Sequence, residues 1–331
     1  MRSLATAVAV FCLAILGAAP VAGAAFPGRN GRIAYTEDAC GRTAVWTMRP
    51  DGTDERLVAP KGCTGDSASA RRPAWAPNGR RLIFEFTPPP TADTQLTLAD
   101  ADGTDRAAVP LAPPPSAPEQ GRDFDRSDAA FAPDGRRFVY QRYFYDGSPP
   151  EIWLAAVDGS EDRRLLPGRL ARWSPDGRTI AYVPPTENPD TDEEREHGTW
   201  LMSARTGKRL RRVWGHSAQS LDWAPDGRRL VASRSGEGVR ILRRDGKGTR
   251  RLVRSRAGRA ADGQAVWSPD GRRISFVRLR SVPDGGGESG LDVEIWTIGT
   301  RGTRARRIWT RHHGFDSDSS LPTLSWQPVP R

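Results

Sequence analysis

The chain has 331 residues, of which 37% are hydrophobic and 27% are charged, a composition typical of an ordinary globular protein with one large core. Its formal net charge of +10 comes almost entirely from arginine, because lysine occurs only at positions 61, 208 and 247. Beyond the N-terminus no apolar segment is long enough to cross a bilayer, which excludes a protein with several membrane spans.

Residues 1–25 have the features of a secretory signal peptide. Arg2 supplies the basic start, Leu4 to Leu16 form the apolar core, and Ala22-Gly23-Ala24 is a small-residue cleavage site. We therefore expect cleavage near Ala24 and a mature domain over residues 26–331 that is secreted or periplasmic, without stable insertion in a membrane. A retained N-terminal anchor is the alternative.

The mature chain repeats a short phrase, which consists of an aromatic residue, a small residue, Pro, Asp or Asn, Gly, Arg and an apolar run. Its copies are Trp75–Phe84, Phe131–Tyr140, Trp173–Tyr182, Trp223–Ala232 and Trp267–Phe276. Asp-Gly or Asn-Gly between two apolar runs indicates a tight hairpin turn, because glycine tolerates positive φ. The prolines of the phrase, at 77, 133, 175, 225 and 269, recur every 42 to 56 residues. This period is typical of a four-stranded propeller blade.

A second hairpin phrase follows each of the five copies of the first, and a sixth precedes the copy at Trp75. Its turns are Asp51-Gly52, Asp102-Gly103, Asp158-Gly159, Thr206-Gly207, Asp245-Gly246 and Arg301-Gly302. Each unit therefore holds strands A, B, C and D, with tight A–B and C–D turns. In an up-and-down blade both turns lie on one face of the disc, which we name the turn face. The B–C and D–A connections lie on the opposite face, which we name the loop face.

The two ends of the chain complete the count of blades. The first B strand, Gly31–Tyr35, follows only a degraded A strand over Phe26–Asn30, whereas the chain ends in an A strand over Leu324–Pro328. We predict that this C-terminal strand completes the first blade. The fold would then be all-β, a six-bladed β-propeller of four-stranded blades, whose closure leaves no open edge between its first and last units.

The phrase Trp-Ser-Pro-Asp-Gly, as it stands at Trp173 and Trp267, resembles the WD40-like PD40 repeat of TolB-type propellers. The resemblance extends from about Phe26 to Pro328. It implies a six-bladed fold and, for TolB itself, protein–protein contacts in the bacterial periplasm.

Removal of the signal peptide leaves two cysteines, Cys40 and Cys63. Cys40 falls in the B–C loop of the first blade and Cys63 in the D–A connection that follows, so both belong to the loop face. In an oxidising compartment such a pair indicates a disulfide, which would contribute roughly 3 kcal/mol by the chain-entropy estimate. Two free thiols are the alternative.

Signatures of catalysis and of metal binding are scarce. There is no Gly-x-Ser-x-Gly elbow, and the histidines at 197, 216, 312 and 313 lack the spacing of a zinc protease. The acidic residues Asp190, Asp192, Glu193, Glu194 and Glu196 could bind calcium through oxygen ligands, but they lack the residue order of an EF-hand, and a solvated loop is the favoured explanation. We expect no cofactor, with calcium as the alternative.

Two surface features are candidates for contact with a partner. Arginine follows the A–B turns, at positions 32, 80, 136, 178, 228 and 272, and would make the turn face basic. Solvated turn residues that cover apolar surface with their stems are the favoured explanation of this pattern. Tyr143, Phe144 and Tyr145 form an aromatic cluster near a loop, which is either a contact patch or an extension of the third blade's B strand. His312 and His313 are further candidate contacts.

These patterns favour a non-enzymatic, exported scaffold. We expect a monomer that binds a protein or an anionic envelope polymer through its loop face, because function concentrates on variable loops carried by a rigid frame. Export and the lack of a stacking motif disfavour nucleic acid, and we expect none as a partner. The alternative is a hydrolase or lyase with a metal-dependent site at the mouth of the central channel.

Overall fold

The computed structural model describes residues 26–39, 41–60, 68–89, 93–111, 124–185, 198–255, 260–283, 289–313 and 322–330. The predicted signal peptide, the pair Cys40 and Cys63, and the acidic run Asp190–Glu196 lie outside these residues. The cleavage site near Ala24, the disulfide and calcium binding therefore stay predictions.

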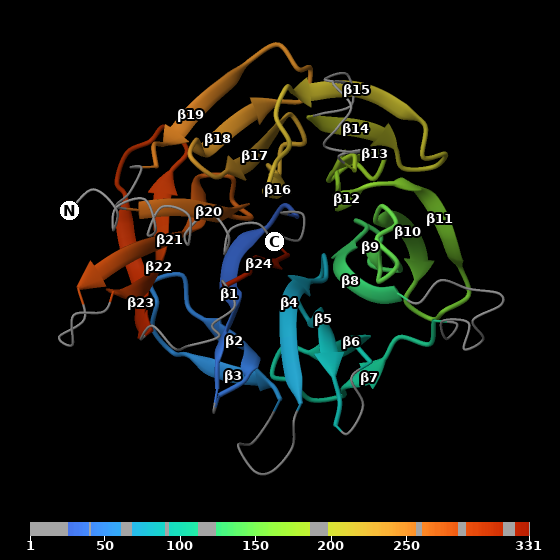
Figure 1. Cartoon of the computed structure of the whole chain (residues 1–331), viewed down its shortest axis with the longest axis horizontal. Coiled ribbons are helices and arrows are strands. Elements are labelled where there is room, and N and C mark those ends of the chain that lie inside the picture. The colour runs from blue at the N-terminus through green and yellow to red at the C-terminus, as the bar shows by residue number, and fades with distance from the viewer. Residues whose placement is uncertain are drawn as a thin grey trace.

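Six antiparallel sheets of four strands each surround a central axis (Figure 1). Blade 1 consists, from the axis outward, of β24 (Leu324–Val329), β1 (Arg29–Asp38), β2 (Thr43–Met48) and β3 (Arg56–Ala59). Blade 2 consists of β4 (Ser69–Trp75), β5 (Arg81–Thr87), β6 (Gln95–Asp100) and β7 (Ala107–Ala108). Blade 3 consists of β8 (Phe124–Phe131), β9 (Arg137–Phe144), β10 (Glu151–Ala156) and β11 (Asp162–Pro167).

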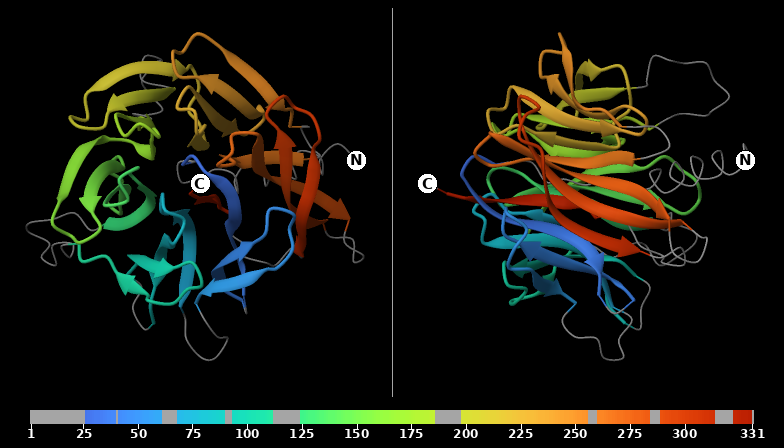
Figure 2. Two further views of the ribbon diagram at one scale, coloured as in Figure 1. Left: turned by 180° about the vertical axis from the view of Figure 1, so that it is seen from behind. Right: turned by 90° about the vertical axis from the view of Figure 1, so that its left-hand side faces the viewer.

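The other three blades repeat this order, and Figure 2 shows the ring from behind and edge-on. Blade 4 consists of β12 (Arg169–Trp173), β13 (Thr179–Val183), β14 (Thr199–Ser203) and β15 (Arg209–Trp214). Blade 5 consists of β16 (Ser220–Trp223), β17 (Arg229–Arg234), β18 (Gly238–Arg243) and β19 (Thr249–Val253). Blade 6 consists of β20 (Ala260–Trp267), β21 (Arg273–Pro283), β22 (Ser289–Gly299) and β23 (Arg306–His313). The predicted all-β, six-bladed propeller is confirmed. No helix in the described part of the chain is long and apolar enough to span a membrane.

The core lies between neighbouring blades. Trp75, Trp173, Trp223 and Trp267 end inner strands and are among the largest fully buried side chains. Trp223 of blade 5 packs in one cluster with Leu201 of blade 4, and Trp173 of blade 4 packs in one cluster with Val139 of blade 3. Large aromatic side chains at a repeated strand position therefore join each blade to its neighbour.

The Pro-Asp-Gly phrase also joins neighbouring blades. A Cβ atom on Gly177 would lie 3.8 Å from the ring of Pro133, and one on Gly227 would lie 3.8 Å from the ring of Pro175. Each of these turn glycines thus packs on the proline of the preceding blade's phrase. The Asp of the phrase accepts a hydrogen bond from the backbone N–H two residues later, at 3.0 Å for Asp176. These contacts give each residue of the phrase a structural role.

Pairing of β24 with β1 closes the ring, as predicted. Trp326 pairs with Ile33 and is buried. Gln327 accepts a hydrogen bond from the backbone N–H of Arg32 at 2.8 Å and donates one to the carbonyl oxygen of Gly79 in blade 2 at 2.6 Å. β1 begins at Arg29, so part of the segment assigned to a degraded A strand extends the B strand instead.

Two glycine substitutions test the contribution of this closure to stability. Gly79 and Gly177 occupy equivalent turns with φ of +67° and +70°, so alanine at either position costs about 1–2 kcal/mol in backbone strain. At Gly79, unlike at Gly177, the new Cβ would lie 2.0 Å from the carbonyl oxygen of Pro328, which belongs to β24. Displacement of β24 should add about 1–3 kcal/mol of destabilisation. We expect urea denaturation to show a larger loss of unfolding free energy for Gly79→Ala than for Gly177→Ala, and equal losses would contradict this role for the closure.

Candidate functional site

The inner strands carry a repeated distortion near the mouth of the channel on the loop face. β4, β8, β12 and β20 each shift register by a bulge, and one residue in each bulge has positive φ. These residues are Arg72, Asp128, Leu170 and Gln264, with φ between +51° and +59°. A bulge re-aims the side chain it carries, and such distortions are common next to functional sites.

Glu85 of β5 is the centre of a buried ion-pair group. Its carboxylate accepts hydrogen bonds from Arg71 Nε at 2.9 Å and from Arg72 at 2.9 Å. It also accepts the backbone N–H of Asp128, in the next blade, at 2.9 Å. The buried carboxylate thus has partners from two blades, which compensates the cost of removing its charge from water.

Asp128 continues the group into blade 4. Its Oδ1 pairs with the Arg172 guanidinium at 2.7 Å, and both side chains are buried. Burial raises the pKa of Asp128, whereas Arg172 acts in the opposite direction. Loss of one partner from such a pair costs about 3–5 kcal/mol, because the other charge stays buried and unpaired. The pair therefore holds blades 3 and 4 together at the channel.

Arg169, at the start of β12, adds a further charge beside this pair. Burial lowers the pKa of its guanidinium, and the carboxylate of Asp128 acts in the opposite direction. Within the described residues Arg169 forms no ion pair. We name Arg71, Arg72, Glu85, Asp128, Arg169 and Arg172 the channel cluster. Its four arginines and two carboxylates leave an excess of two positive charges.

Another buried group lies between blades 1 and 6. Glu37, at the end of β1, is 3.3 Å from His313 Nε2 and 4.0 Å from Arg311 Nε. Burial raises the pKa of Glu37 to about 7, whereas a hydrogen bond from the backbone of Asp38 and the charge of Arg311 act in the opposite direction. Burial lowers the pKa of His313, with Arg311 as the next cause. Glu37 is thus an acid that titrates near neutral pH.

The predicted contact residues divide into exposed and buried side chains. Tyr143 and Tyr145 are 52% and 60% exposed, and their rings meet edge to face at 6.2 Å. Phe144 is buried and belongs with Tyr143 to β9, so the cluster partly extends the B strand. His312 is exposed and lies 2.9 Å from Asp292, whereas His313 is buried against Glu37. The tyrosines and His312 lie on blades 3 and 6, across the ring from each other (Figure 1).

The channel cluster was absent from the sequence-based candidates. One signal for it was present: Glu85 stands between Phe84 and Phe86, and Arg172 directly precedes Trp173, so each is a charge inside an apolar strand. Among the residues the structure describes, no three His, Cys, Asp or Glu side chains are grouped so that they could hold a metal ion.

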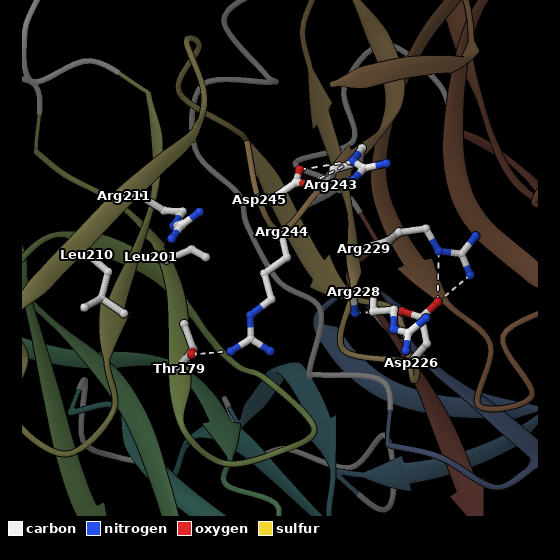
Figure 3. A pocket seen from close by; sticks show the side chains of 10 residues that line it. All are labelled: Thr179, Leu201, Leu210, Arg211, Asp226, Arg228, Arg229, Arg243, Arg244 and Asp245. Atoms are coloured by element: carbon white, nitrogen blue, oxygen red, sulfur yellow. Dashed lines mark hydrogen bonds and ion pairs between the residues drawn. The ribbon is translucent and has the colours of Figure 1, made fainter. Parts of the chain in front are cut away.

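A groove of about 900 Å³ opens on the turn face between blades 4 and 5 (Figure 3). Its lining residues are Thr179, Leu201, Leu210, Arg211, Asp226, Arg228, Arg229, Arg243, Arg244 and Asp245. Arg244 of blade 5 reaches blade 4, where it donates hydrogen bonds to Asp176 at 2.8 Å and to Thr179 at 2.6 Å. The groove is therefore a basic site on the face opposite the channel cluster.

Comparison with curated proteins gives partial matches. No protein-family model matches the chain. A probable DNA ligase of Anaeromyxobacter dehalogenans (strain 2CP-C) is 27% identical over 236 residues, which is 67% of this chain and 43% of that protein. The uncharacterized peptidase YuxL of Bacillus subtilis (strain 168) is 32% identical over 130 residues, 37% of this chain and 18% of that protein. The chain thus spans less than half the length of these relatives.

Comparison with solved structures identifies the fold. TolB from Acinetobacter baumannii superposes with a TM-score of 0.60 at 18% identity, covering 90% of this chain and 67% of TolB. A putative TolB from Agrobacterium tumefaciens gives 0.56 at 18% identity, with 91% and 99% coverage. A prolyl endopeptidase gives 0.52 at 14% identity, with 86% and 49% coverage. The fold of this chain is the TolB-like six-bladed β-propeller.

Proposed function

We propose that this protein is an exported binding scaffold whose loop face receives a protein partner at the mouth of the channel. The observation that carries the proposal is the exposed tyrosine pair of blade 3, which strand β8 connects to the channel cluster. Tyr145 donates a hydrogen bond to Asp125 at 2.6 Å, and Asp125 lies on β8, the inner strand that also carries Asp128 of the channel cluster. Exposed aromatic and charged groups therefore border one region of the loop face.

The chemistry of this region suits a protein surface that presents carboxylates. Tyr and Arg are the residue types that most often carry the binding energy of protein interfaces. The excess positive charge of the channel cluster lies among buried groups, where the low dielectric constant strengthens its field at the mouth. A carboxylate of the partner could pair with Arg169 while the tyrosines supply apolar contact. The TolB-like fold is compatible with this role, since a closed propeller is a rigid support for such a surface.

Cross-linking from the loop face tests the proposal. A photoreactive amino acid at Tyr143 should cross-link the immobilised, folded protein to a partner in envelope extract, and the same group at Arg136, on the turn face, should not. With the purified partner, the variant Tyr143→Ser/Arg169→Glu should bind at least tenfold more weakly, since loss of one major interface residue costs about 2 kcal/mol or more. The matched variant Arg80→Glu/Arg136→Glu, altered at two exposed turn-face arginines, should bind as the parent does. Equal binding by both variants would contradict the proposal.

One observation favours the alternative, a hydrolase or lyase, but it places the reactive group between blades 1 and 6 and away from the channel axis, because His313 lies on the outermost strand β23. A carboxyl group with a pKa near 7 beside an imidazole is a candidate general acid or base. This alternative predicts turnover of ester, lactone or uronate substrates, with or without added manganese or calcium, that is lost in Glu37→Gln. The binding proposal predicts no turnover and leaves partner binding intact in Glu37→Gln.

The raised pKa of Glu37 has a consequence for stability that is measurable without a substrate. Its pKa is about 7 in the folded protein and 4.5 as the ordinary value, so the folded state binds the extra proton between these pH values. The stabilising contribution is complete below pH 4.5 and is lost as the pH rises through 7. Relative to Glu37→Gln, the unfolding free energy of the parent should fall by about 3 kcal/mol across this window.

Urea denaturation at intervals from pH 4.5 to 8 measures this difference. The control is Glu161→Gln, which removes a carboxylate paired with Arg163 on the surface at 2.9 Å. We expect the unfolding free energy of the parent to fall progressively relative to that of Glu37→Gln as the pH rises, and the control curve to run parallel to the parent. A constant difference between the parent and Glu37→Gln would show that Glu37 is not the titrating group.

A further inference from the structure

We propose that the groove between blades 4 and 5 binds an acidic peptide segment in which an apolar side chain accompanies two separated carboxylates. The groove lies on the turn face, so this site is distinct from the loop-face site and does not depend on it. The proposal rests on three features of the groove, namely its charge, its two uncompensated guanidinium groups and an exposed leucine.

Five arginines and two aspartates line the groove, so its lining is strongly basic. Three of these arginines already have carboxylate partners. Arg229 pairs with Asp226 at 2.6 Å, Arg243 pairs with Asp245, and Arg244 pairs with Asp176 at 2.8 Å. These pairs hold the walls in place. Arg244 also donates a hydrogen bond to the carbonyl oxygen of Gly227 at 3.2 Å, so its guanidinium is fixed between the two blades.

The two remaining arginines, Arg211 and Arg228, are exposed, and their guanidinium groups pair with no residue that the structure describes. Arg211 belongs to β15 of blade 4, and Arg228 to the A–B turn of blade 5. Figure 3 shows the Arg244 side chain between them. A guanidinium can bind a carboxylate with two parallel hydrogen bonds. A ligand that pairs with both arginines from opposite walls therefore needs two separated acidic groups.

The exposed side chain of Leu210 favours an acidic peptide over an anionic polysaccharide as the ligand. It is 53% exposed beside Arg211, and it is one of three large apolar side chains left exposed among the described residues. The other two are Tyr143 and Tyr145 of the loop face. An anionic polysaccharide brings carboxylates but no aliphatic side chain to cover Leu210. A peptide with glutamate or aspartate on either side of a leucine-like residue supplies both, and its apolar group can also contact the aliphatic stems of the arginines.

The test uses the full mature chain and two fluorescent peptides that differ only in their apolar residues. The first alternates glutamate with leucine, and the second replaces each leucine by serine. Fluorescence anisotropy should show that Arg211→Gln/Arg228→Gln weakens binding of the first peptide at least tenfold. The control Arg80→Gln/Arg136→Gln removes the same charge from exposed turn-face arginines of blades 2 and 3 and should weaken binding less than threefold. Thermal unfolding of each variant should match the parent, because all four side chains are exposed.

Leu210→Ser provides the second arm of the test. It should weaken binding of the leucine peptide about fivefold and leave the serine peptide unchanged. Equal losses of peptide affinity in the groove variant and the control would show that the peptide is attracted by net charge alone, and would overturn the proposal. Stronger binding of an oligoglucuronate than of the leucine peptide, insensitive to Leu210→Ser, would overturn it in favour of a polysaccharide. The loop-face variant Tyr143→Ser/Arg169→Glu should bind both peptides as the parent does, so failure of the loop-face proposal would leave this result unaffected.

Discussion

Strands β24 and β1 come from opposite ends of the chain, and their pairing in blade 1 holds the ring closed. Gln327 links this strand pair to the turn of blade 2 through Gly79, and Ser325 accepts a hydrogen bond from the backbone N–H of Trp75 at 3.1 Å. The closing strand β24 is therefore hydrogen-bonded to β1 in its own blade and to blade 2. Without it, blade 1 would expose a strand edge, and the inner strands would no longer surround a common channel.

The channel depends on this closure because its buried charges pair across blade boundaries. Glu85 of blade 2 bonds to the backbone of Asp128 in blade 3, and Asp128 pairs with Arg172 in blade 4. Buried charges of this kind are tolerable only while every partner stays in place. The bulges that place Arg72 and Asp128 are likewise maintained by the blades on either side. A rigid ring and a charged channel are thus parts of one arrangement.

The two faces of the disc present different chemistry. The loop face carries Arg169, an exposed pair of tyrosines and a buried group of ion pairs. The turn face carries the groove lined by Leu210, Arg211 and Arg228, and neither of these arginines forms an ion pair with a residue that the structure describes. The shared fold with TolB proteins does not select between them, because identity to those structures is 18% and a fold supports many functions. The function therefore depends on the specific side chains that each face presents.

The sequence alone determined the blades. Six closed blades were predicted correctly from the Asp-Gly turns, the strand tryptophans and the A strand at the C-terminus. These signals are visible in the sequence because each is a short local pattern or recurs at a fixed period. Tertiary structure alone decided the sites. Arg172 and Asp128 meet across 44 residues, and Arg72 occupies the left-handed region, for which an arginine gives no signal. Such contacts arise only where separate blades meet. Local patterns therefore mark Glu85 and Arg172 as charges inside apolar strands, but they do not show which residues these charges meet, nor the groove beside Leu210.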